Sequence, residues 1–503
     1  MDAVTEWMAV WGDNLWTWIV LPVVVGLGLY FTIRSRGVQF RLIPEMFRTL
    51  TDKTPRDENG EPQSVSAFQA FTISAASRVG VGNIAGVGTA IALGGPGAVF
   101  WMWLMALIGG ASSFIESSLA QLYKTRDKDG FRGGPAYYMQ RGLGARWMGI
   151  VFAIILIVCF PIAFSSLQAN TIQATIAGSM GESAADWLAP ATGVGLALLM
   201  GLVVFGGVRR IASVTQALVP AMAVLYLLIG IAIVAMHVDR IPAVISSIFA
   251  DAFGYNEVVG AALGYIILTG ARRGMFSNEA GLGSAPNAGA SAAVTHPVKQ
   301  GLVQTLGVYF DTFLVCSITA FIILVSVPDL STATQGIGLT QDAITSTLGD
   351  WANVLLIIII FLLAFSSILG NYYYGQSNIE FITSSRAVLL GYRIVAIVSV
   401  FAGALISAGV VWTFADGVMG FMALTNLVAI ALLSGVAFKL LKDYSQQRRA
   451  GLDPVFTSDR LPEVKGVEVW EDALSVTGPI DLPTKKRQAN KHRDHLHGAP
   501  RAE

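Results

Sequence analysis

Long apolar stretches recur along the chain at lengths that suit membrane-spanning helices. A spanning helix needs about 20 mostly apolar residues. Eleven stretches meet this requirement: 14–33, 66–93, 97–123, 147–177, 190–207, 211–236, 256–294, 301–327, 351–384, 387–408 and 411–440. They lack the alternation of apolar and polar positions that marks the strands of a membrane barrel. The sequence therefore predicts an all-α polytopic membrane protein with eleven spans.

Composition supports membrane insertion and excludes two other classes. Of 503 residues, 54% are apolar and only 13% are charged, against about 25% charged in ordinary soluble domains. Lys plus Arg and Asp plus Glu balance at 33 each, which excludes a broadly basic nucleic-acid binder. Cys159 and Cys316 both lie in apolar stretches, so no disulfide framework is expected.

The cations predict the orientation. They gather after the first span, in the loop 124–146, at Arg209 and Arg210, and in the C-terminal tail. With eleven spans these segments all fall on one side, and cytoplasmic loops carry the excess of Lys and Arg. The N-terminus is therefore expected outside and the C-terminus in the cytoplasm. Residues 1–14 contain no Lys or Arg, unlike the basic start of a cleaved signal peptide.

Glycine and polar residues interrupt two of the spans, at 77–86 in the second and at 269–283 in the seventh. If the first span is set aside, ten spans remain, and the two interrupted spans are the first members of two groups of five. Because each group has an odd number of spans, the second group crosses the membrane in the opposite orientation to the first. Paired broken helices in inverted repeats indicate the binding site of a secondary transporter. The freed N–H groups suit a carboxylate, and the freed carbonyls suit an amine or Na⁺.

Such glycines can also serve only to let helices pack closely. We adopt that interpretation for Gly86, Gly88, Gly109 and Gly110. For Gly80, Gly82 and Gly274 we expect a binding site instead, because polar side chains interrupt the same helices.

Several longer motifs carry a family resemblance. They are Val81–Val87, Ala92–Met102, Gly133–Met139, Gln168–Asn170, Arg272–Pro286 and Tyr372–Gly375, with Trp412, Asp416 and Asn426 near the end. Together they resemble the alanine or glycine:cation symporter family of amino-acid transporters, over about residues 64 to 440.

The resemblance implies a LeuT-like fold, a five-plus-five inverted repeat with one peripheral N-terminal helix. Residues 1–63 would hold an outer N-terminus, that helix and a cytoplasmic linker, and 64–440 the core, with repeats at 64–236 and 256–440. Residues 441–503, which end in a basic, histidine-containing run, are expected to form a disordered tail. The implied location is the inner (plasma) membrane of a bacterium or archaeon.

The implied function is sodium-coupled uptake of a small neutral amino acid, alanine or glycine, by alternating access. Proton coupling, as in some members, and a preference for glutamine stay open as alternatives. The expected partners are the amino acid and membrane lipid, with Na⁺ as the co-transported ion. The oligomeric state stays open.

The resemblance also implies which residues bind the substrate. The carboxylate would lie against Gly80, Gly82, Asn83 and Ile84, and the opposing break at Gly274, Phe276, Ser277 and Asn278 would hold the amine and side chain. Gln168 lies in an otherwise apolar run, where it either bonds a neighbouring helix or contacts the substrate.

By similarity to the sodium site of this fold, five oxygens would hold Na⁺. They are the hydroxyls of Ser366 and Ser367 and the carbonyls of Leu363, Ala76 and Val79. The alternative is that both hydroxyls bond back to carbonyls of their own helix.

One position departs from the family pattern. Asn371 stands where well-known alanine transporters of the family have tryptophan, and Gln376 stands where an acid is common. Asn371 shares a helical face with Ser367. The shorter side chain predicts a pocket that admits a larger amide such as glutamine.

Ionisable residues inside spans need partners. We expect Arg78, Arg272 and Arg273 to pair with Glu279, Glu116 or Asp311. Trp412, near the end of a span, is expected to be an interface anchor.

Other classes of membrane protein fit the sequence less well. A channel or receptor should show a repeated pore motif or a sizeable soluble domain, and an intramembrane enzyme should show a catalytic pair such as Ser and His inside the spans. None of these features, and no nucleotide-binding P-loop, is found in the sequence.

Overall fold

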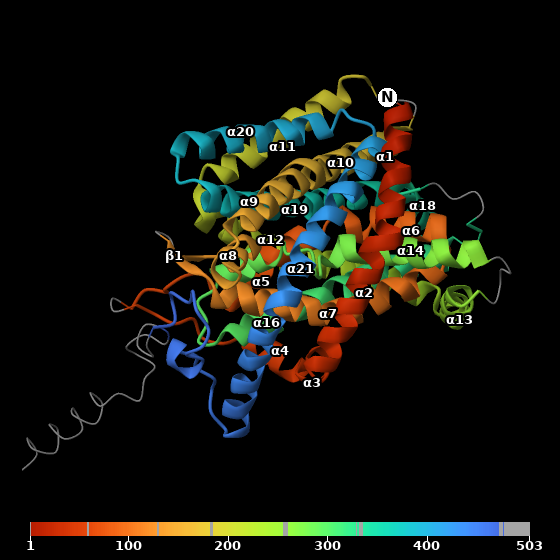
Figure 1. Ribbon diagram of the computed structural model, residues 1–503. Helices are drawn as coiled ribbons and strands as arrows, with labels where there is room; N and C mark the ends of the chain where they lie inside the picture. The colour runs from red at the N-terminus through yellow and green to blue at the C-terminus, as the bar shows by residue number, and fades with distance from the viewer. Residues whose placement is uncertain are drawn as a thin grey trace, which may run out of the picture.

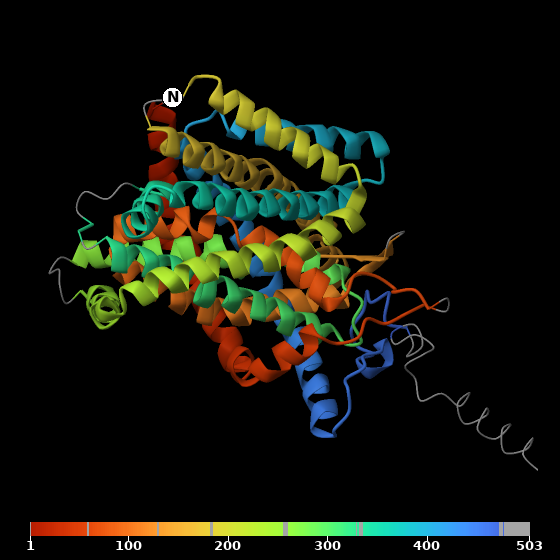
Figure 2. The ribbon, with the colours of Figure 1, turned by 180° about the vertical axis from the view of Figure 1, so that it is seen from behind.

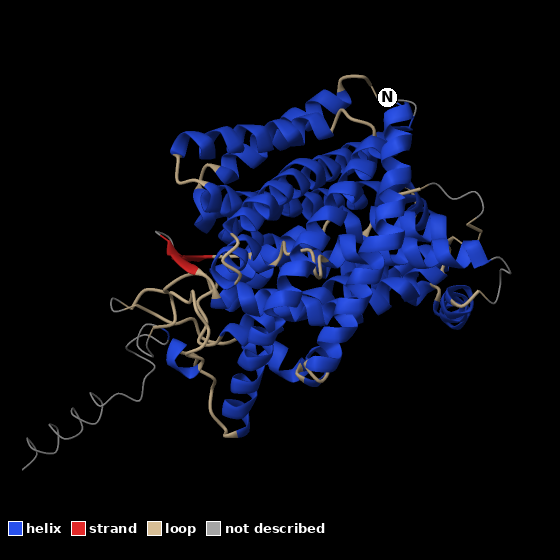
Figure 3. Ribbon diagram, in the orientation of Figure 1, coloured by secondary structure: helices blue, strands red, loops and turns tan. Residues whose placement is uncertain are grey.

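The computed structural model describes residues 2–57, 60–127, 130–181, 185–254, 260–327, 329–330, 335–471 and 476. The described chain is helical apart from one short antiparallel hairpin and the connecting loops (Figure 3). In it, eight helices are long and apolar enough to cross a membrane, judged by length and composition alone. Two spans that are split into halves and the shorter α11 account for the other predicted stretches.

The first half of the chain contains the following elements: α1 Asp2–Leu15, α2 Leu21–Arg34, α3 Val38–Arg41, α4 Ile43–Leu50, α5 Ala67–Arg78, α6 Ala85–Gly94, α7 Gly97–Leu122, β1 Thr125–Asp127, β2 Gly130–Arg132, α8 Pro135–Gly142, α9 Arg146–Ile157, α10 Ser165–Met180, α11 Leu188–Val204 and α12 Gly207–Met236. A wider π-helical turn joins α1 to α2, and another joins α9 to α10. Each of these pairs is therefore one continuous span.

The second half contains α13 Ile241–Ala252, α14 Gly260–Asn278, α15 Pro286–Ser291, α16 Pro297–Tyr309, α17 Ser317–Ser326, α18 Ile337–Leu348, α19 Ala352–Ile382, α20 Arg386–Gly403 and α21 Ala408–Arg449. A π-helical turn, Phe310–Cys316, makes α16 and α17 one span. Every one of the eleven predicted stretches corresponds to a helix or to a pair of helical halves.

The helices form a bundle in which the two split spans lie inside. Helix α7 packs against α14 and α16, and α19 packs against α5 and α10. Helices α11 and α20 lie side by side at the edge of the bundle, as both views show (Figure 1, Figure 2). The short helices α13 and α18 lie at one end of the bundle, and β1 and α8 lie at the other (Figure 1).

The expected disordered tail is wrong for residues 441–471. Helix α21 continues to Arg449, and the chain then folds back onto the end of the bundle that carries β1 and α8. Trp470 is 1% exposed, and its indole N–H donates to Gln121 O at 3.1 Å. The backbone N–H of Phe456 donates to Thr295 O at 2.8 Å. The segment is ordered because Phe456 and Trp470 are buried against the bundle. Its charge-rich composition gave no sign of this burial. The basic, histidine-containing run lies outside the described residues.

Lys124 links this returning segment to the bundle. Its ammonium donates to Ala292 O at 2.9 Å and lies 4.0 Å from the ring centre of Phe131 and 4.7 Å from that of Trp470. Burial lowers the pKa of Lys124 well below its ordinary value. A carbonyl and two aromatic faces offset only part of the lost hydration.

Truncating the buried indole should release this segment. Because loss of a buried aromatic side chain costs about 3 kcal/mol, Trp470→Ala should raise the population of the open segment roughly a hundredfold. Limited trypsin digestion, scored at Arg460 and Lys465, measures this. Leu452→Ala, which removes a side chain that is 56% exposed, is the control; equal cleavage rates in both variants would contradict the packing role of Trp470.

Candidate functional site

The first split span is interrupted by an extended residue and a short 3₁₀ turn. Helix α5 begins with a capping box made by Ser66 and Gln69 and ends at Arg78. Gly80 then adopts φ −138° and ψ −148°, and a 3₁₀ turn at Val81–Asn83 leads into α6. The N–H of Gly80 donates to Asn83 Oδ1 at 2.9 Å. In a continuous helix that N–H would bond Ala76 O, so the break releases this carbonyl.

The released carbonyls face α19. Ser367 Oγ lies 2.8 Å from Ala76 O, 3.5 Å from Val79 O and 3.1 Å from Leu363 O. A hydroxyl has one hydrogen to donate, so it satisfies only one of these three acceptors at a time. Leu363 O also accepts a backbone N–H within the continuous helix α19, so the shortage of hydrogens concerns Ala76 O and Val79 O, which share the one hydroxyl hydrogen.

Ser366 lies at the edge of this oxygen cluster. Its hydroxyl bonds Leu363 O at 2.9 Å and lies 3.3 Å from Met222 Sδ. This bond within the helix is the alternative considered from the sequence, whereas Ser367 bonds across to the other helix as well. Ser367 therefore contacts three of the other four oxygens named from the sequence, whereas Ser366 contacts only Leu363 O among them.

Gln168 of α10 contacts the same break. Its Oε1 accepts from the N–H of Val81 at 3.0 Å. A Cβ on Gly80 would lie 2.9 Å from Gln168 Oε1 and 2.2 Å from Ser367 Oγ. Only glycine lets three helices meet this closely. Ile84, at the start of α6, is buried, and its carbonyl accepts from Thr340 at 3.3 Å.

The second break covers only the last part of the predicted run 269–283 and extends two residues beyond it. Helix α14 is continuous through Gly274, Phe276, Ser277 and Asn278, and the unwound stretch is 279–285. The expectation that Gly274 lies in a break is therefore wrong. A Cβ there would lie 3.2 Å from Met102 Cα in α7, so this glycine permits close helix packing.

Three residues shape the actual break, because Glu279, Gly281 and Gly283 have φ of 57°, 82° and 81°. The carboxylate of Glu116 holds the loop, accepting from the N–H groups of Gly281 at 3.2 Å and Gly283 at 3.1 Å. Asn426 donates to the same carboxylate at 2.7 Å and accepts from the hydroxyl of Tyr138. Side chains of the protein itself therefore satisfy the freed amides of this loop.

Phe276 is the residue of α14 that reaches the first break. A Cβ on Gly82 would lie 2.8 Å from its ring. The ring packs against Phe164, with centroids 4.4 Å apart, and against Trp412, at 4.9 Å. Trp412 is therefore not an interface anchor as expected, because its ring faces the inside of the bundle and also lies under Arg273.

The neighbouring polar residues converge on Asp311. Asn83 Nδ2 donates to Asp311 Oδ1 at 2.6 Å, and Ser277 Oγ donates to Asp311 Oδ2 at 2.8 Å. Asn278 turns instead to Thr312 Oγ1, at 3.2 Å. The carboxylate of Asp311 thus joins the first break to α14 without any arginine within ion-pair distance in the described residues.

The expected pairing of Arg272 and Arg273 is wrong, because both arginines pair with Asp416. Arg272 also pairs with Asp13, at 2.7 Å. Arg78 donates to Gln304 O at 3.1 Å, and its Nε and second terminal nitrogen have no hydrogen-bond partner among the described residues. Asp416 belongs to α21, so the packing of α14 against this distant segment decides which carboxylate the two arginines meet.

Asn371 lies beside the candidate site and is 1% exposed. Its Oδ1 accepts from Ser77 Oγ at 2.8 Å, and the same hydroxyl lies 2.7 Å from Glu279 Oε1. Ser77 and Phe164 were missed in the sequence. Ser77 begins the interrupted run and could have been found from that position, whereas nothing in the sequence distinguishes Phe164 from other apolar residues of its span.

Two helices are split at mid-length. One exposes backbone carbonyls, and the other faces it across a buried aromatic ring. This arrangement defines a secondary transporter of the LeuT fold. The solved structure of MhsT in complex with L-phenylalanine supports this fold, with a TM-score of 0.50 at 15% identity over 85% of this chain and 97% of that one.

The sequence model of the sodium:alanine symporter family matches residues 1–458. The amino-acid carrier protein AlsT of Bacillus subtilis is 51% identical over 460 residues, which is 92% of this chain and 96% of the relative. The probable sodium/glutamine symporter GlnT of the same organism is 46% identical over 459 residues, 91% of this chain and 94% of the relative. The chain belongs to the sodium:alanine symporter family and is a transporter, not an enzyme.

The crowding at Gly80 yields a matched pair of variants. Gly80→Ala should abolish sodium-driven amino-acid uptake, because its methyl group would overlap the Ser367 hydroxyl. Gly86→Ala should retain most of the uptake, since the nearest atom to its new Cβ belongs to Trp412 at 3.8 Å. Uptake of radiolabelled alanine into proteoliposomes tests this, and equal activity of the two variants would refute the close meeting of helices at Gly80.

Proposed function

We propose that this protein carries a small neutral amino acid into the cell together with Na⁺, by alternating access. The observation that carries the proposal is the convergence of the Ala76, Val79 and Leu363 carbonyls on the hydroxyl of Ser367. Hard cations prefer oxygen ligands, and a cation relieves the shortage of hydrogens among these oxygens. Ser366 supplies the fifth oxygen.

The amino acid would bind next to these oxygens, at the first break. Its carboxylate fits the start of α6, where first-turn N–H groups have no partner within the helix. Gly82 leaves room for this approach, and Gln168 and Asn83 supply amides at its edge. Phe276 bounds the space for the side chain, which favours a small substrate such as alanine or glycine.

A proton could replace Na⁺ as the coupling ion, and Asp311 is the carboxylate that would bind it. It bonds both Asn83 and Ser277 and so touches both split helices. Sodium remains our proposal, because the oxygen cluster at Ser367 contains no titratable group.

Glutamine is the second candidate substrate. Asn371 places a short amide where Ser77 and Ser165 surround it, and Ser165 lies one turn before Gln168. An amide side chain of the substrate would find hydrogen-bond partners there. The similarity to the probable sodium/glutamine symporter GlnT is consistent with this candidate.

We further propose that the end carrying β1, α8 and the segment 450–471 faces the cytoplasm, with the N-terminus outside. The basic residues of loop 124–146 lie at that end, in line with the positive-inside rule. Residues 64–236 and 256–440 would be the two inverted repeats, each beginning with one split helix, and residues 1–63 would lie outside the repeats.

Removal of the central hydroxyl should weaken sodium binding. Ser367→Ala should raise the Na⁺ concentration for half-maximal alanine uptake at least roughly tenfold, as expected for the loss of one charged contact. Ser399→Ala is the control, since that hydroxyl bonds Val395 O within its own helix. An unchanged Na⁺ dependence, or accumulation that follows a pH gradient instead, would overturn the sodium assignment.

Enlarging the side chain at position 371 should narrow the range of substrates. Asn371→Trp should reduce glutamine uptake roughly tenfold or more relative to alanine uptake, because the indole fills the space beside Ser77. Competition of unlabelled glutamine and glycine with labelled alanine measures the range. A variant that still accepts glutamine as well as the parent protein would contradict the role of Asn371.

A further inference from the structure

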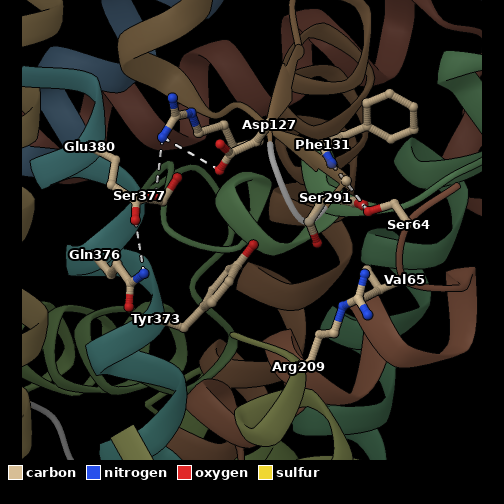
Figure 4. A pocket seen from close by; sticks show the side chains of 12 residues that line it. Ser64, Val65, Asp127, Phe131, Arg209, Ser291, Tyr373, Gln376, Ser377 and Glu380 are labelled. Carbon is tan, nitrogen blue, oxygen red and sulfur yellow. Dashed lines mark hydrogen bonds and ion pairs between the residues drawn. The ribbon is translucent and has the colours of Figure 1, made fainter. Parts of the chain in front are cut away.

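A polar cavity lies at the end of the bundle that carries β1 and α8 (Figure 4). The β1–β2 hairpin, α12 and α19 all contribute side chains to this cavity. The charged and amide groups among its lining residues are those of Asp127, Arg132, Arg209, Gln376 and Glu380, and Tyr373 points into it. None of these residues belongs to the site described above.

The charges of the cavity are divided between two sides. Arg132 lies 3.2 Å from Glu380 and 3.5 Å from Asp127, so this side carries two carboxylates and one guanidinium. Arg209 lies across the cavity from them, beyond Tyr373 (Figure 4). Carboxylates thus line one side of the cavity and a guanidinium lines the other, an arrangement that suits the two charged ends of a zwitterion.

Two buried polar atoms of the lining have no hydrogen-bond partner among the described residues. They are Gln376 Oε1 and Arg132 Nε. Gln376 is 5% exposed, and its Nε2 donates to Glu380 Oε1 at 2.8 Å. A buried acceptor of this kind requires a donor, and an ammonium group carries donors only.

The cavity also adjoins both split helices. Val65, two residues before α5, and Ser291, the last residue of α15, line it. The two segments are joined there, because Ala293 N–H donates to Val65 O at 2.9 Å. Tyr373 lies two residues beyond Asn371 on α19. The cavity therefore adjoins the segments that lead into both split helices.

We propose that this cavity is a second amino-acid binding site on the exit path, resting on the proposed function above. The substrate ammonium binds Gln376 Oε1 and Glu380, and its carboxylate binds Arg209. An amino acid that leaves the first break stops here before release. Affinity measured from the cytoplasmic face then depends on these residues, and affinity measured from outside does not.

The test compares the two faces of the membrane with the full-length protein. Inverted vesicles present the cytoplasmic face to radiolabelled alanine, and right-side-out vesicles present the outer face. Gln376→Leu and Glu380→Gln should each raise the KM for alanine at the cytoplasmic face roughly tenfold, the effect of one lost charged hydrogen bond. The KM at the outer face should stay within about twofold of the parent value.

Glu463→Gln is the matched control, because it makes the same change in an exposed acid paired with Lys439. An unchanged cytoplasmic KM in Gln376→Leu and Glu380→Gln would overturn the exit site. Equal changes at both faces would overturn it as well, since the residues would then act on the balance of conformations. If the parent protein shows no sodium-driven uptake, the proposed function itself fails; normal uptake with an unchanged cytoplasmic KM removes the exit site alone.

Discussion

Backbone N–H and C=O groups that are released from a helix inside the membrane need hydrogen-bond partners, and the other features of this structure depend on that requirement. Lipid offers no hydrogen bonds, so a helix can unwind there only where protein side chains or ligands supply partners. The first split helix meets this requirement with Ser367, Gln168 and Asn83, which reach it from α19, from α10 and from its own 3₁₀ turn. Helices α10 and α19 therefore pack where their uncharged side chains can reach the break.

The two breaks are satisfied in opposite ways. At the second, the carboxylate of Glu116 binds the amides of Gly281 and Gly283, and Asn426 completes the network. Side chains of the protein thus already bind the N–H groups of Gly281 and Gly283. At the first, carbonyl oxygens outnumber the hydrogens offered by Ser367. This asymmetry is the reason why we propose that the cation and the amino acid bind at the first break, with Phe276 of α14 bounding the site.

Different interactions close the two ends of the bundle. Toward the start of α21, the tilted rings of Phe276 and Trp412 pack together beside Arg273, which pairs with Asp416. At the opposite end, the Arg132–Glu380 pair joins the hairpin to α19 beside a polar cavity. An aromatic cluster excludes water, whereas a cavity lined by charged and amide groups can hold water or a polar ligand. Each end therefore has contacts suited to one step of an alternating-access cycle.

The sequence alone predicted the spans and the interruption of two of them, and the family resemblance added the oxygen atoms around Ser367 as a prediction. These features are local: apolar length, glycine beside polar residues, and hydroxyls inside apolar runs. Tertiary structure decided the rest. It confined the second break to 279–285 and kept Gly274 inside a helix, because α7 packs closely against both Gly270 and Gly274 of α14. It also decided that Arg272 and Arg273 pair with Asp416 and not with Glu279. In the segment whose composition indicated disorder, it buried the side chain of Trp470. Ion pairs and burial depend on which helices become neighbours, and no spacing within one helix specifies that.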